Sequence, residues 1–227
     1  MSRSVLFDTE TTGLDPLLGD RVIEIAALEL EHELPTGRQF HVVLDPERDI
    51  PEEASRIHGI TSADVTGKPR FAAIAAELLA FLDEAPLIAH NAPFDFGFLN
   101  AEFARIGMPS LDPARMIDTL ALAKARFPGL PNSLDALCRR FSIDLSARTR
   151  HNALLDCRLL AEVYVELSGG RQRGLELAAE SAAPLVAYTH DGARVPRPIV
   201  PDAEERAAHA AFVARLKDPL WPADPTG

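Results

Sequence analysis

Residues 4–14 read SVLFDTETTGL, a short apolar run that leads directly into a pair of acidic residues. The apolar part predicts a buried strand, and the glycine after it predicts a turn. Asp8 and Glu10 are two positions apart, so in an extended chain their side chains share one face. Two such carboxylates repel each other in a partly buried site, and a divalent cation that prefers oxygen ligands, Mg2+ or Mn2+, removes the repulsion. The alternative is a pair of solvated acids at the end of a strand.

The remainder of residues 1–170 predicts a mixed sheet with helices on its faces. Three strands that suit an antiparallel meander are predicted first, at 4–7, 21–30 and 39–44. Apolar periodicity then predicts short strands at 87–89 and 116–117, and helices at 71–82, 94–106, 118–126, 133–141 and 154–167. Strands followed by alternating helices and strands indicate an α/β fold with both antiparallel and parallel pairs.

A second acidic motif lies at residues 90–99, which read HNAPFDFGFL. It places Asp95 near the start of a helix, with Asn91 as the predicted cap and Pro93 in the first turn. The helix macrodipole alone would favour an acid at this position. Because aromatic residues flank it on both sides, however, Asp95 is expected either to reach the surface or to find a cation.

A third motif lies at residues 151–156, which read HNALLD and begin the last helix of this part of the chain. Asp156 falls on the apolar stripe of that helix, where a carboxylate rarely stays unpaired. A buried ion pair or a helix cap would also satisfy it. His151 lies about 140° away on an ideal helix, so it can act beside Asp156 only from the loop or the first turn. Otherwise His151 is a structural or solvated histidine.

Taken together, the three motifs resemble the DEDDh exonuclease family, also called the DnaQ-like or ribonuclease-H-like exonucleases. The four acids and the histidine of the family name correspond to Asp8, Glu10, Asp95, Asp156 and His151. Within the family, four further segments look like those of the proofreading (epsilon) subunits of bacterial DNA polymerase III. They are IHGI at 57–60, NSLDALC at 132–138, LAEVY at 160–164 and the glycine pair at 169–170.

The resemblance implies a ribonuclease-H-like fold and a metal-dependent 3'-5' exonuclease that removes mispaired 3'-terminal nucleotides as 5'-mononucleotides. It implies that two Mg2+ or Mn2+ ions, able to activate water and stabilise a leaving oxygen, are held by Asp8, Glu10, Asp95 and Asp156. His151 would be the general base, a task that suits an imidazole with an ordinary pKa of about 6.5.

The same resemblance implies a pocket for the terminal nucleotide. Three of the metal-binding acids, Asp8, Glu10 and Asp156, would also meet the substrate. Glu53 would accept a hydrogen bond from the 3'-hydroxyl group, and His58 would contact the nucleotide. The backbone N–H groups of residues 9–12 are further candidates for nucleotide binding. The alternative is that Glu53 is a helix-capping acid and His58 a turn histidine.

Composition limits how such a protein can bind DNA. The 227 residues carry a formal charge of -11, whereas binding by counterion release requires a basic surface. Metal ions or a partner must therefore supply the positive charge. Cys138 and Cys157 lie in helix-like segments, so we expect both to be reduced, buried thiols. No apolar run approaches the roughly 20 residues that span a bilayer, and the start of the chain does not resemble a signal peptide, which predicts a cytoplasmic protein.

The composition changes after the glycine pair, since residues 171–227 hold 7 of the 18 prolines. We therefore predict an exonuclease domain at 1–170, a Pro-rich linker at 171–201 and a partner-binding tail at 202–227. Within the linker, QRGLEL resembles the short peptides that bind the β sliding clamp, with its contacts at Gln172, Leu175 and Leu177. The alternative is that this segment is simply linker.

The sequence of the tail indicates a helix that begins after Asp202, which caps it, with Glu205 at the capping-box position. Its small apolar face extends to Leu216, Pro219 ends it, and Trp221 follows as a candidate anchor for a partner. The tail is similar to the C-terminal segment with which epsilon subunits bind the polymerase (alpha) subunit. The alternative is a tail that folds back on its own domain.

Two other functions compete with proofreading. One is a DEDDh exoribonuclease that trims RNA 3' ends, although such relatives generally lack a long partner-binding tail. The other is a catalytically inactive scaffold between a polymerase and a clamp. The presence of all five active-site side chains argues against that scaffold.

Overall fold

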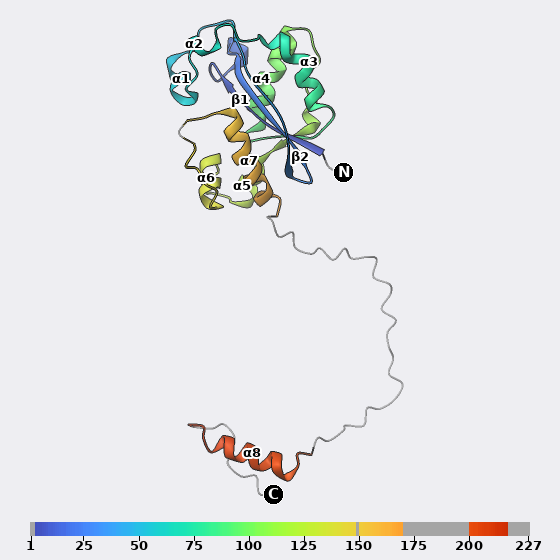
Figure 1. The fold of residues 1–227 in the computed structure, drawn as a ribbon, viewed down its shortest axis with the longest axis vertical. Helices are drawn as coiled ribbons and strands as arrows, with labels where there is room; N and C mark the ends of the chain where they lie inside the picture. The colour runs from blue at the N-terminus through green and yellow to red at the C-terminus, as the bar shows by residue number, and fades with distance from the viewer. Residues whose placement is uncertain (1–2, 149, 170–199, 218–227) are drawn as a thin grey trace, which may run out of the picture. The chain divides into compact units, whose positions relative to one another are not determined.

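The computed structural model describes residues 3–148, 150–169 and 200–217 (Figure 1). Contacts divide the chain into two compact units, Met1–Glu176 and Leu177–Gly227. Across the described ranges, every helix is too short or too polar to cross a membrane.

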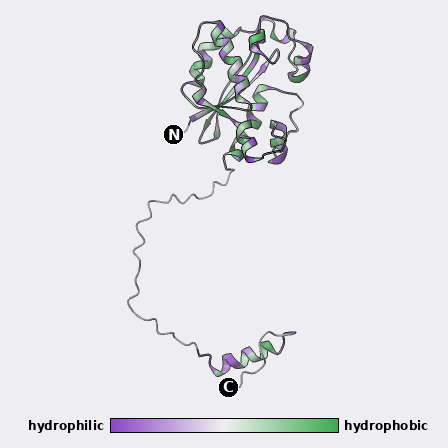
Figure 2. Ribbon diagram, turned by 180° about the vertical axis from the view of Figure 1, so that it is seen from behind, coloured by the Kyte–Doolittle hydropathy of each residue, from purple (hydrophilic) through white to green (hydrophobic). Residues whose placement is uncertain are grey.

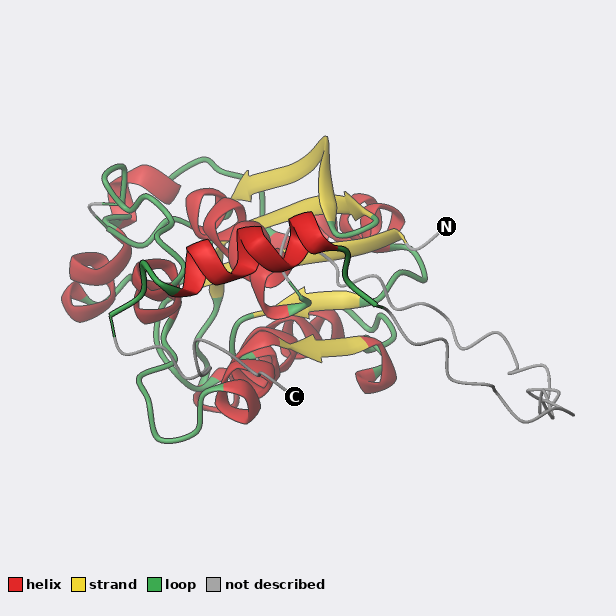
Figure 3. Cartoon of the chain, turned by 90° about the horizontal axis from the view of Figure 1, so that it is seen from below, coloured by secondary structure: helices red, strands yellow, loops and turns green. Residues whose placement is uncertain are grey.

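The first unit is built on a five-stranded sheet in the order β3-β2-β1-β4-β5 (Figure 3). Its strands are β1 (Arg3–Thr11), β2 (Val22–Glu31), β3 (Leu34–Val43), β4 (Leu87–Ala89) and β5 (Met116–Asp118). Antiparallel pairs join β1 to β2 and β2 to β3, whereas β4 runs parallel to β1 and to β5. The predicted mixed sheet, an antiparallel meander plus parallel strands, is confirmed.

Strand β1 is longer than the sequence predicts. Its ladder with β2 extends from the pair Arg3 and Glu31 to the pair Thr11 and Val22. The acidic pair Asp8 and Glu10 therefore lies inside the strand and not after its end. The physical reason is that backbone pairing with β2 continues beyond the apolar side chains, which were the only signal for the strand in the sequence.

Helices cover both faces of this sheet, and the alternation of side chains along β1 decides which face each residue meets. Val5 and Phe7 pack with α3 (Phe71–Leu82) and α4 (Ala92–Arg105). Leu6 packs on the other face with α5 (Thr119–Arg126), α6 (Leu134–Arg140) and α7 (Ala153–Leu167). Because the period is two, Asp8 and Glu10 continue the row of Leu6, on the face that α7 covers.

Two short helices, α1 (Glu52–His58) and α2 (Ser62–Val65), are additional to those predicted. They pack against β2 in a small cluster made of Ile23, Ile50, Ala54 and Val65. Each helix buries a single residue of this cluster, so the sequence carried too little periodicity to reveal it.

The start of α4 differs from the prediction that Asn91 caps it. Asn91 stands at the cap position with a left-handed backbone, φ 67°, and its side chain makes no capping bond. Instead Asp118 Oδ1 accepts from the N–H groups of Asn91 at 3.0 Å and Ala92 at 3.3 Å. A carboxylate at the end of β5 thereby fixes the first turn of the helix that carries Asp95.

Cys138 and Cys157 lie on α6 and α7, and both are free and buried. Burial raises the pKa of Cys138 to about 11 and that of Cys157 well above its usual range. Both therefore remain protonated thiols at neutral pH, as the sequence predicted.

The second unit contains α8 (Ala203–Val213), which Asp202 and Glu205 close with a capping box as predicted. Both hydrophilic and hydrophobic residues occur along it, the former toward its start and the latter toward its end (Figure 2). The helix ends at Val213, before Leu216, because the following residues form tighter bonds three residues back, such as Leu216 N–H to the Val213 carbonyl at 3.0 Å. Several residues predicted to act in the linker and the tail lie outside the described residues: Gln172, Leu175, Leu177, Pro219 and Trp221.

Candidate active site

One cleft of about 940 Å³ brings together acidic residues that are far apart in the sequence. Strand β1 lines it from one side, and the starts of α4 and α7 line it from others. The predicted site residues of the first unit all line this cleft: Asp8, Glu10, Glu53, His58, Asp95, His151 and Asp156. The residues that were predicted to act in one active site therefore lie around the same cleft.

Glu10 carries the clearest sign of a missing ligand. Its side chain is buried, with the residue 7% exposed, and its Oε1 atom has no hydrogen-bond partner within the described structure. Burial, together with the charges of Asp156 and Glu24, raises its pKa to about 8. Burial also raises the pKa of Asp8 well above its usual range, and Asp95 and Glu10 add to the effect. These carboxylates are costly to ionise together unless a cation joins them.

Asp95 is 3% exposed on α4 and finds a partner that the sequence did not suggest. Its Oδ1 atom accepts from the Thr9 N–H at 3.0 Å and from the Thr9 hydroxyl at 2.7 Å. Burial raises its pKa to about 7, although the bonds from Thr9 act in the opposite direction. The N–H of Thr12 likewise donates to the Arg21 carbonyl at 2.9 Å. Contrary to expectation, the N–H groups of Thr9 and Thr12 are thus already used within the protein.

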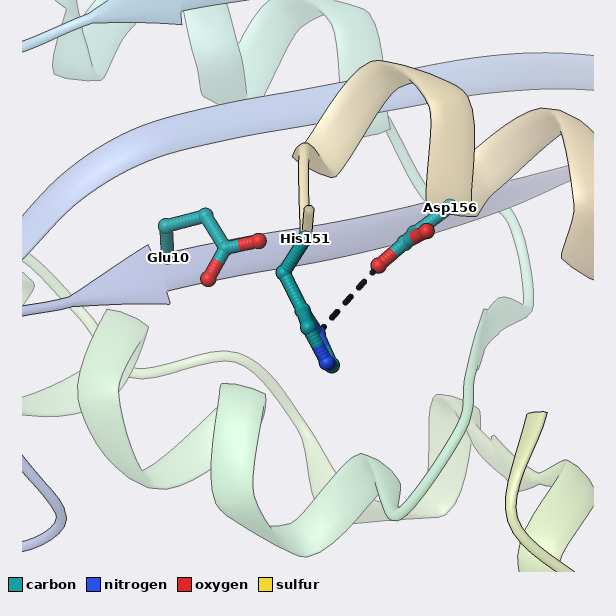
Figure 4. A group of neighbouring side chains, drawn as sticks. All are labelled: Glu10, His151 and Asp156. Atoms are coloured by element: carbon teal, nitrogen blue, oxygen red, sulfur yellow. Dashed lines mark ion pairs between the residues drawn. The ribbon is translucent and has the colours of Figure 1, made fainter. Parts of the chain in front are cut away.

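His151 lies in the loop just before α7, which is the position that lets it turn toward Asp156. Its Nδ1 atom is 3.5 Å from Asp156 Oδ2. Figure 4 shows Glu10, His151 and Asp156 converging from β1, the loop and α7. Each of the three can offer one ligand atom, and these atoms all lie within 4.8 Å of one another.

Arg148 belongs to this site, although the sequence offered little to single it out. Its Nε and Nη2 atoms donate to Asp156 Oδ1 at 2.6 Å and Oδ2 at 2.8 Å. Nη1 donates to Asp135 Oδ1 at 2.5 Å, and the side chain is only 9% exposed. The sole signal in the sequence was the cluster of basic residues shortly before His151.

Glu24 is a second residue that sequence reasoning missed. It pairs with Glu10 across the β1–β2 ladder and is 2% exposed. Its carboxylate accepts from the Ala153 N–H and from the Asn152 side chain, both at 3.2 Å, and lies 2.7 Å from His41 Nε2. Strand β2 thereby fixes the first turn of α7, which carries Asp156. A charged residue within an apolar strand segment was the available signal.

This contact predicts the effect of a conservative substitution. Glu24→Gln keeps the size of the side chain but removes the charge that holds the first turn of α7. We expect the free energy of unfolding to fall by about 1–3 kcal/mol, with faster hydrogen exchange at the Ala153 amide. Chemical denaturation and exchange measured by NMR would check this, with the exposed Glu77→Gln on α3 as control. Unchanged exchange at Ala153 would contradict the anchoring role.

The raised pKa values predict how stability of the metal-free protein depends on pH. In the unfolded chain, Glu10 ionises near its ordinary pKa, so its protonated form stabilises the fold at low pH, and that stabilisation is lost as pH rises through about 8. Burial lowers the pKa of His58 and His90, but both are neutral above pH 7 and do not oppose the effect there. In EDTA we therefore expect the unfolding temperature to fall as the pH rises from about 7 to about 8 and to level off above that, because Glu10 is then ionised in the folded and the unfolded chain. Glu10→Gln should reduce the fall, and saturating Mg2+ should remove it. An unfolding temperature independent of pH in EDTA would contradict the buried-acid interpretation.

The donor set fits a hard divalent cation. Carboxylate oxygens dominate the cleft, and one of them is buried with no hydrogen-bond partner in the part of the chain that the structure describes. Mg2+ and Mn2+ prefer such oxygen ligands. A water-filled site would leave several buried carboxylates competing for protons, whereas bound cations would allow all of them to ionise.

Comparison with known proteins gives the same family that the three sequence motifs predicted. The exonuclease family model matches residues 5–164. The solved structure of exonuclease X in complex with 5' overhanging duplex DNA superposes with a TM-score of 0.57 at 26% identity, and covers 74% of this chain and 92% of that one. Exonuclease I superposes with a TM-score of 0.65 at 23% identity over 74% of this chain and 41% of its own, which shows the shared fold. Fold and cleft together therefore define a nuclease with a ribonuclease-H-like sheet.

Proteins of similar sequence define a narrower group within this class of nuclease. DNA polymerase III subunit epsilon of Rickettsia conorii is 45% identical over 94% of this chain and 96% of its own length. The Escherichia coli protein of the same name is 43% identical over 75% of this chain and 73% of its own. The chain belongs to the exonuclease family and, within it, to the DNA polymerase III epsilon subunits. The family predicted from the three motifs is confirmed, and the chain is an enzyme of the nuclease class.

Proposed function

We propose that this protein is the proofreading 3'-5' exonuclease of a bacterial replicative DNA polymerase, working in the cytoplasm on mispaired primer ends. The observation that carries the proposal is the convergence of four acids and a histidine in one cleft, where a buried carboxylate oxygen has no hydrogen-bond partner among the described residues. The names of the similar proteins, and the DNA complex of exonuclease X, support DNA as the substrate.

In this proposal, Asp8, Glu10, Asp95 and Asp156 would hold two Mg2+ or Mn2+ ions. When bound, such ions lower the pKa of water and stabilise charge on the phosphate. The fold keeps the four carboxylates in place before binding, since Thr9 holds Asp95 and β2 holds the first turn of α7. The ions also account for DNA binding by an acidic chain, because they supply the positive charge at the scissile phosphate.

His151 acts as the general base in this proposal. Its side chain is 51% exposed, so the ring can meet water in the cleft. When Nδ1 donates its proton to Asp156 Oδ2, which lies 3.5 Å away, Nε2 is the atom available to take a proton from the attacking water. Asp156 then orients the ring and stabilises the imidazolium that forms, as carboxylates beside catalytic histidines do.

The 3'-terminal nucleotide is proposed to bind against α1. His58 Nδ1 accepts from the Ile60 N–H at 3.1 Å, while its Nε2 atom has no partner among the described residues. Burial lowers the pKa of His58, so at neutral pH its remaining proton resides on Nε2, which can donate to a nucleotide. Glu53 lines the same cleft and is exposed to accept from the 3'-hydroxyl.

A direct assay tests the proposed function. The purified protein is incubated with a DNA primer mispaired at its 3' end, or with an RNA oligomer, with and without Mg2+, and mononucleotide release is followed. We expect 5'-deoxynucleotides from the DNA in the presence of metal and none in EDTA. Preferred degradation of RNA would instead support an exoribonuclease, and no release from either substrate would support a scaffold.

Residues 171–227 are proposed to connect the exonuclease at 1–170 to other replication proteins. The linker at 171–201 would offer Gln172, Leu175 and Leu177 to the β sliding clamp. The tail at 202–227, with Trp221, would bind the alpha subunit of the polymerase. The surface of α8 supports this, because almost all of its side chains are exposed, including Phe212 at 58%.

Deletion of residues 200–227 should abolish co-purification with the polymerase alpha subunit. Exonuclease activity on single-stranded DNA should stay within about twofold of the full chain, because the cleft lies wholly in the first unit. Affinity capture and the mononucleotide assay measure the two effects, and Trp221→Ala tests the anchor alone. Undiminished capture of the alpha subunit by the truncated chain would refute the role of the tail.

A further inference from the structure

Arg148 occupies the candidate active site in a way that conflicts with the proposed chemistry. Among the described residues that line the cleft, it is the only lysine or arginine. Its guanidinium bonds to both carboxylate oxygens of Asp156, one of the proposed metal ligands. A divalent ion that approaches Asp156 therefore meets a positive charge and a carboxylate that is already paired.

The same guanidinium also holds His151 in the tautomer that cannot act as the general base. Nη2 lies 3.2 Å from His151 Nδ1. Because a guanidinium can only donate hydrogen bonds, Nδ1 must be the acceptor, and the proton of the neutral ring then resides on Nε2. In this arrangement His151 has no free Nε2 lone pair with which to take a proton from water.

We propose that Arg148 is a positioning residue that acts as an internal counter-ion: it holds Asp156 and His151 in a resting arrangement and leaves Asp156 when a divalent ion binds. The inference rests on the proposed metal-dependent function of the cleft. Once Arg148 withdraws, Asp156 Oδ2 can accept from His151 Nδ1, which lies 3.5 Å away. That bond places the ring proton on Nδ1 and frees Nε2 to act as the base.

The surroundings of Arg148 give its side chain somewhere to go. It lies in the loop between α6 and α7, outside both helices. Its third partner, Asp135, has a side chain that is 38% exposed and lines the same cleft. The guanidinium can therefore release Asp156 and remain paired with Asp135, so binding of the metal does not leave an unpaired buried cation.

The first test observes Arg148 in the unaltered protein. The Nε–H signal of Arg148 is identified by NMR from its loss in Arg148→Lys, and is followed as Mg2+ is added to protein stripped with EDTA. We expect slow exchange with water in EDTA, and at least about tenfold faster exchange when Mg2+ saturates the site, because the short bond to Asp156 is broken. Retention of the slowly exchanging signal at saturation would overturn the proposal.

The second test measures metal affinity without any catalytic readout. Mn2+ binding is titrated by EPR in the unaltered chain, in Arg148→Met and in Arg148→Lys. Arg70→Met at the start of α3, where the arginine is 65% exposed and does not line the cleft, serves as a control with the same change of charge. We expect Arg148→Met to bind Mn2+ about tenfold more tightly, Arg148→Lys to lie between, and the control to match the unaltered chain.

Unfolding temperatures separate this role from a purely structural one. As an internal counter-ion, Arg148 stabilises the metal-free protein, so Arg148→Met should lower the unfolding temperature in EDTA and recover most of the loss with Mn2+. An equal loss in both conditions, or Mn2+ affinity no tighter than in the unaltered chain, would overturn the inference while leaving the proposed function intact. Absence of Mn2+ binding to every variant would instead overturn the metal-dependent function itself.

Discussion

Asp8→Asn is expected to reduce mononucleotide release by at least about a thousandfold. Asp8 lies inside β1, in the row of side chains that faces α7. Its pKa is raised by burial first, and then by the charges of Asp95 and Glu10 around it. The asparagine keeps the shape of the side chain but cannot supply the negative charge that the proposed pair of ions requires. Mononucleotide release from a mispaired primer, at saturating Mg2+ and again with Mn2+, measures the effect.

The fold should survive this change. Asp8→Asn removes a carboxylate that is costly to ionise where it lies, so the unfolding temperature in EDTA should be unchanged or higher. Glu77→Gln, on the outer side of α3, provides a matched loss of one negative charge far from the cleft and should keep full activity. If the Asp8 variant hydrolysed DNA at the normal rate with unaltered dependence on metal, the assignment of the site would be wrong.

His151→Gln is expected to lower kcat by about 10² to 10⁴ while KM and Mn2+ affinity change little. The reason is that the structure places His151 in the loop before α7, beside the carboxylates but with half of its side chain exposed. Glutamine retains hydrogen-bonding capacity at a similar reach but cannot accept a proton at neutral pH. Steady-state kinetics with a single-stranded oligonucleotide, and Mn2+ titration by EPR, give the three quantities separately.

This variant also distinguishes a base from a ligand. Glu10, His151 and Asp156 lie close enough for all three to bind one ion. If His151 were a metal ligand, His151→Gln would weaken Mn2+ binding along with turnover. Asn152, the adjacent residue, caps α7 through its contact with the Leu155 N–H at 3.0 Å, so the loop position is maintained independently of the histidine. Loss of Mn2+ affinity in His151→Gln would therefore reject the role of general base.

The acidic character of the chain fits this chemistry. Lysine and arginine are outnumbered 34 to 23 by aspartate and glutamate, so the surface does not attract a DNA backbone by charge alone. Binding limited to a few phosphates at a metal cluster suits an enzyme that must act on a frayed 3' end and then release it. If the tail binds a polymerase as proposed, that partner would supply the remaining affinity through high local concentration.

Local sequence patterns were sufficient to predict much of the secondary structure and the placement of several site residues. Alternating and helical periodicities placed the strands and the longer helices, because burial of apolar side chains sets both patterns. Asp8 and Glu10 were predicted to share a face, and His151 was predicted to work from a loop, because those conclusions depend only on local backbone geometry.

Tertiary structure decided what depends on contacts between distant residues. Thr9 satisfies Asp95, Glu24 fixes the start of α7, and Arg148 neutralises Asp156, yet each pair is far apart in the sequence or joined across a loop. Local patterns carry no information about such partners, since a buried polar group is satisfied by whichever donor the packing brings near. The sequence by itself predicted the apolar part of each strand, the longer helices and the candidate catalytic set, but not the full length of β1 or the short helices α1 and α2. Only the folded chain determined how their charges are balanced, because that depends on distance through space.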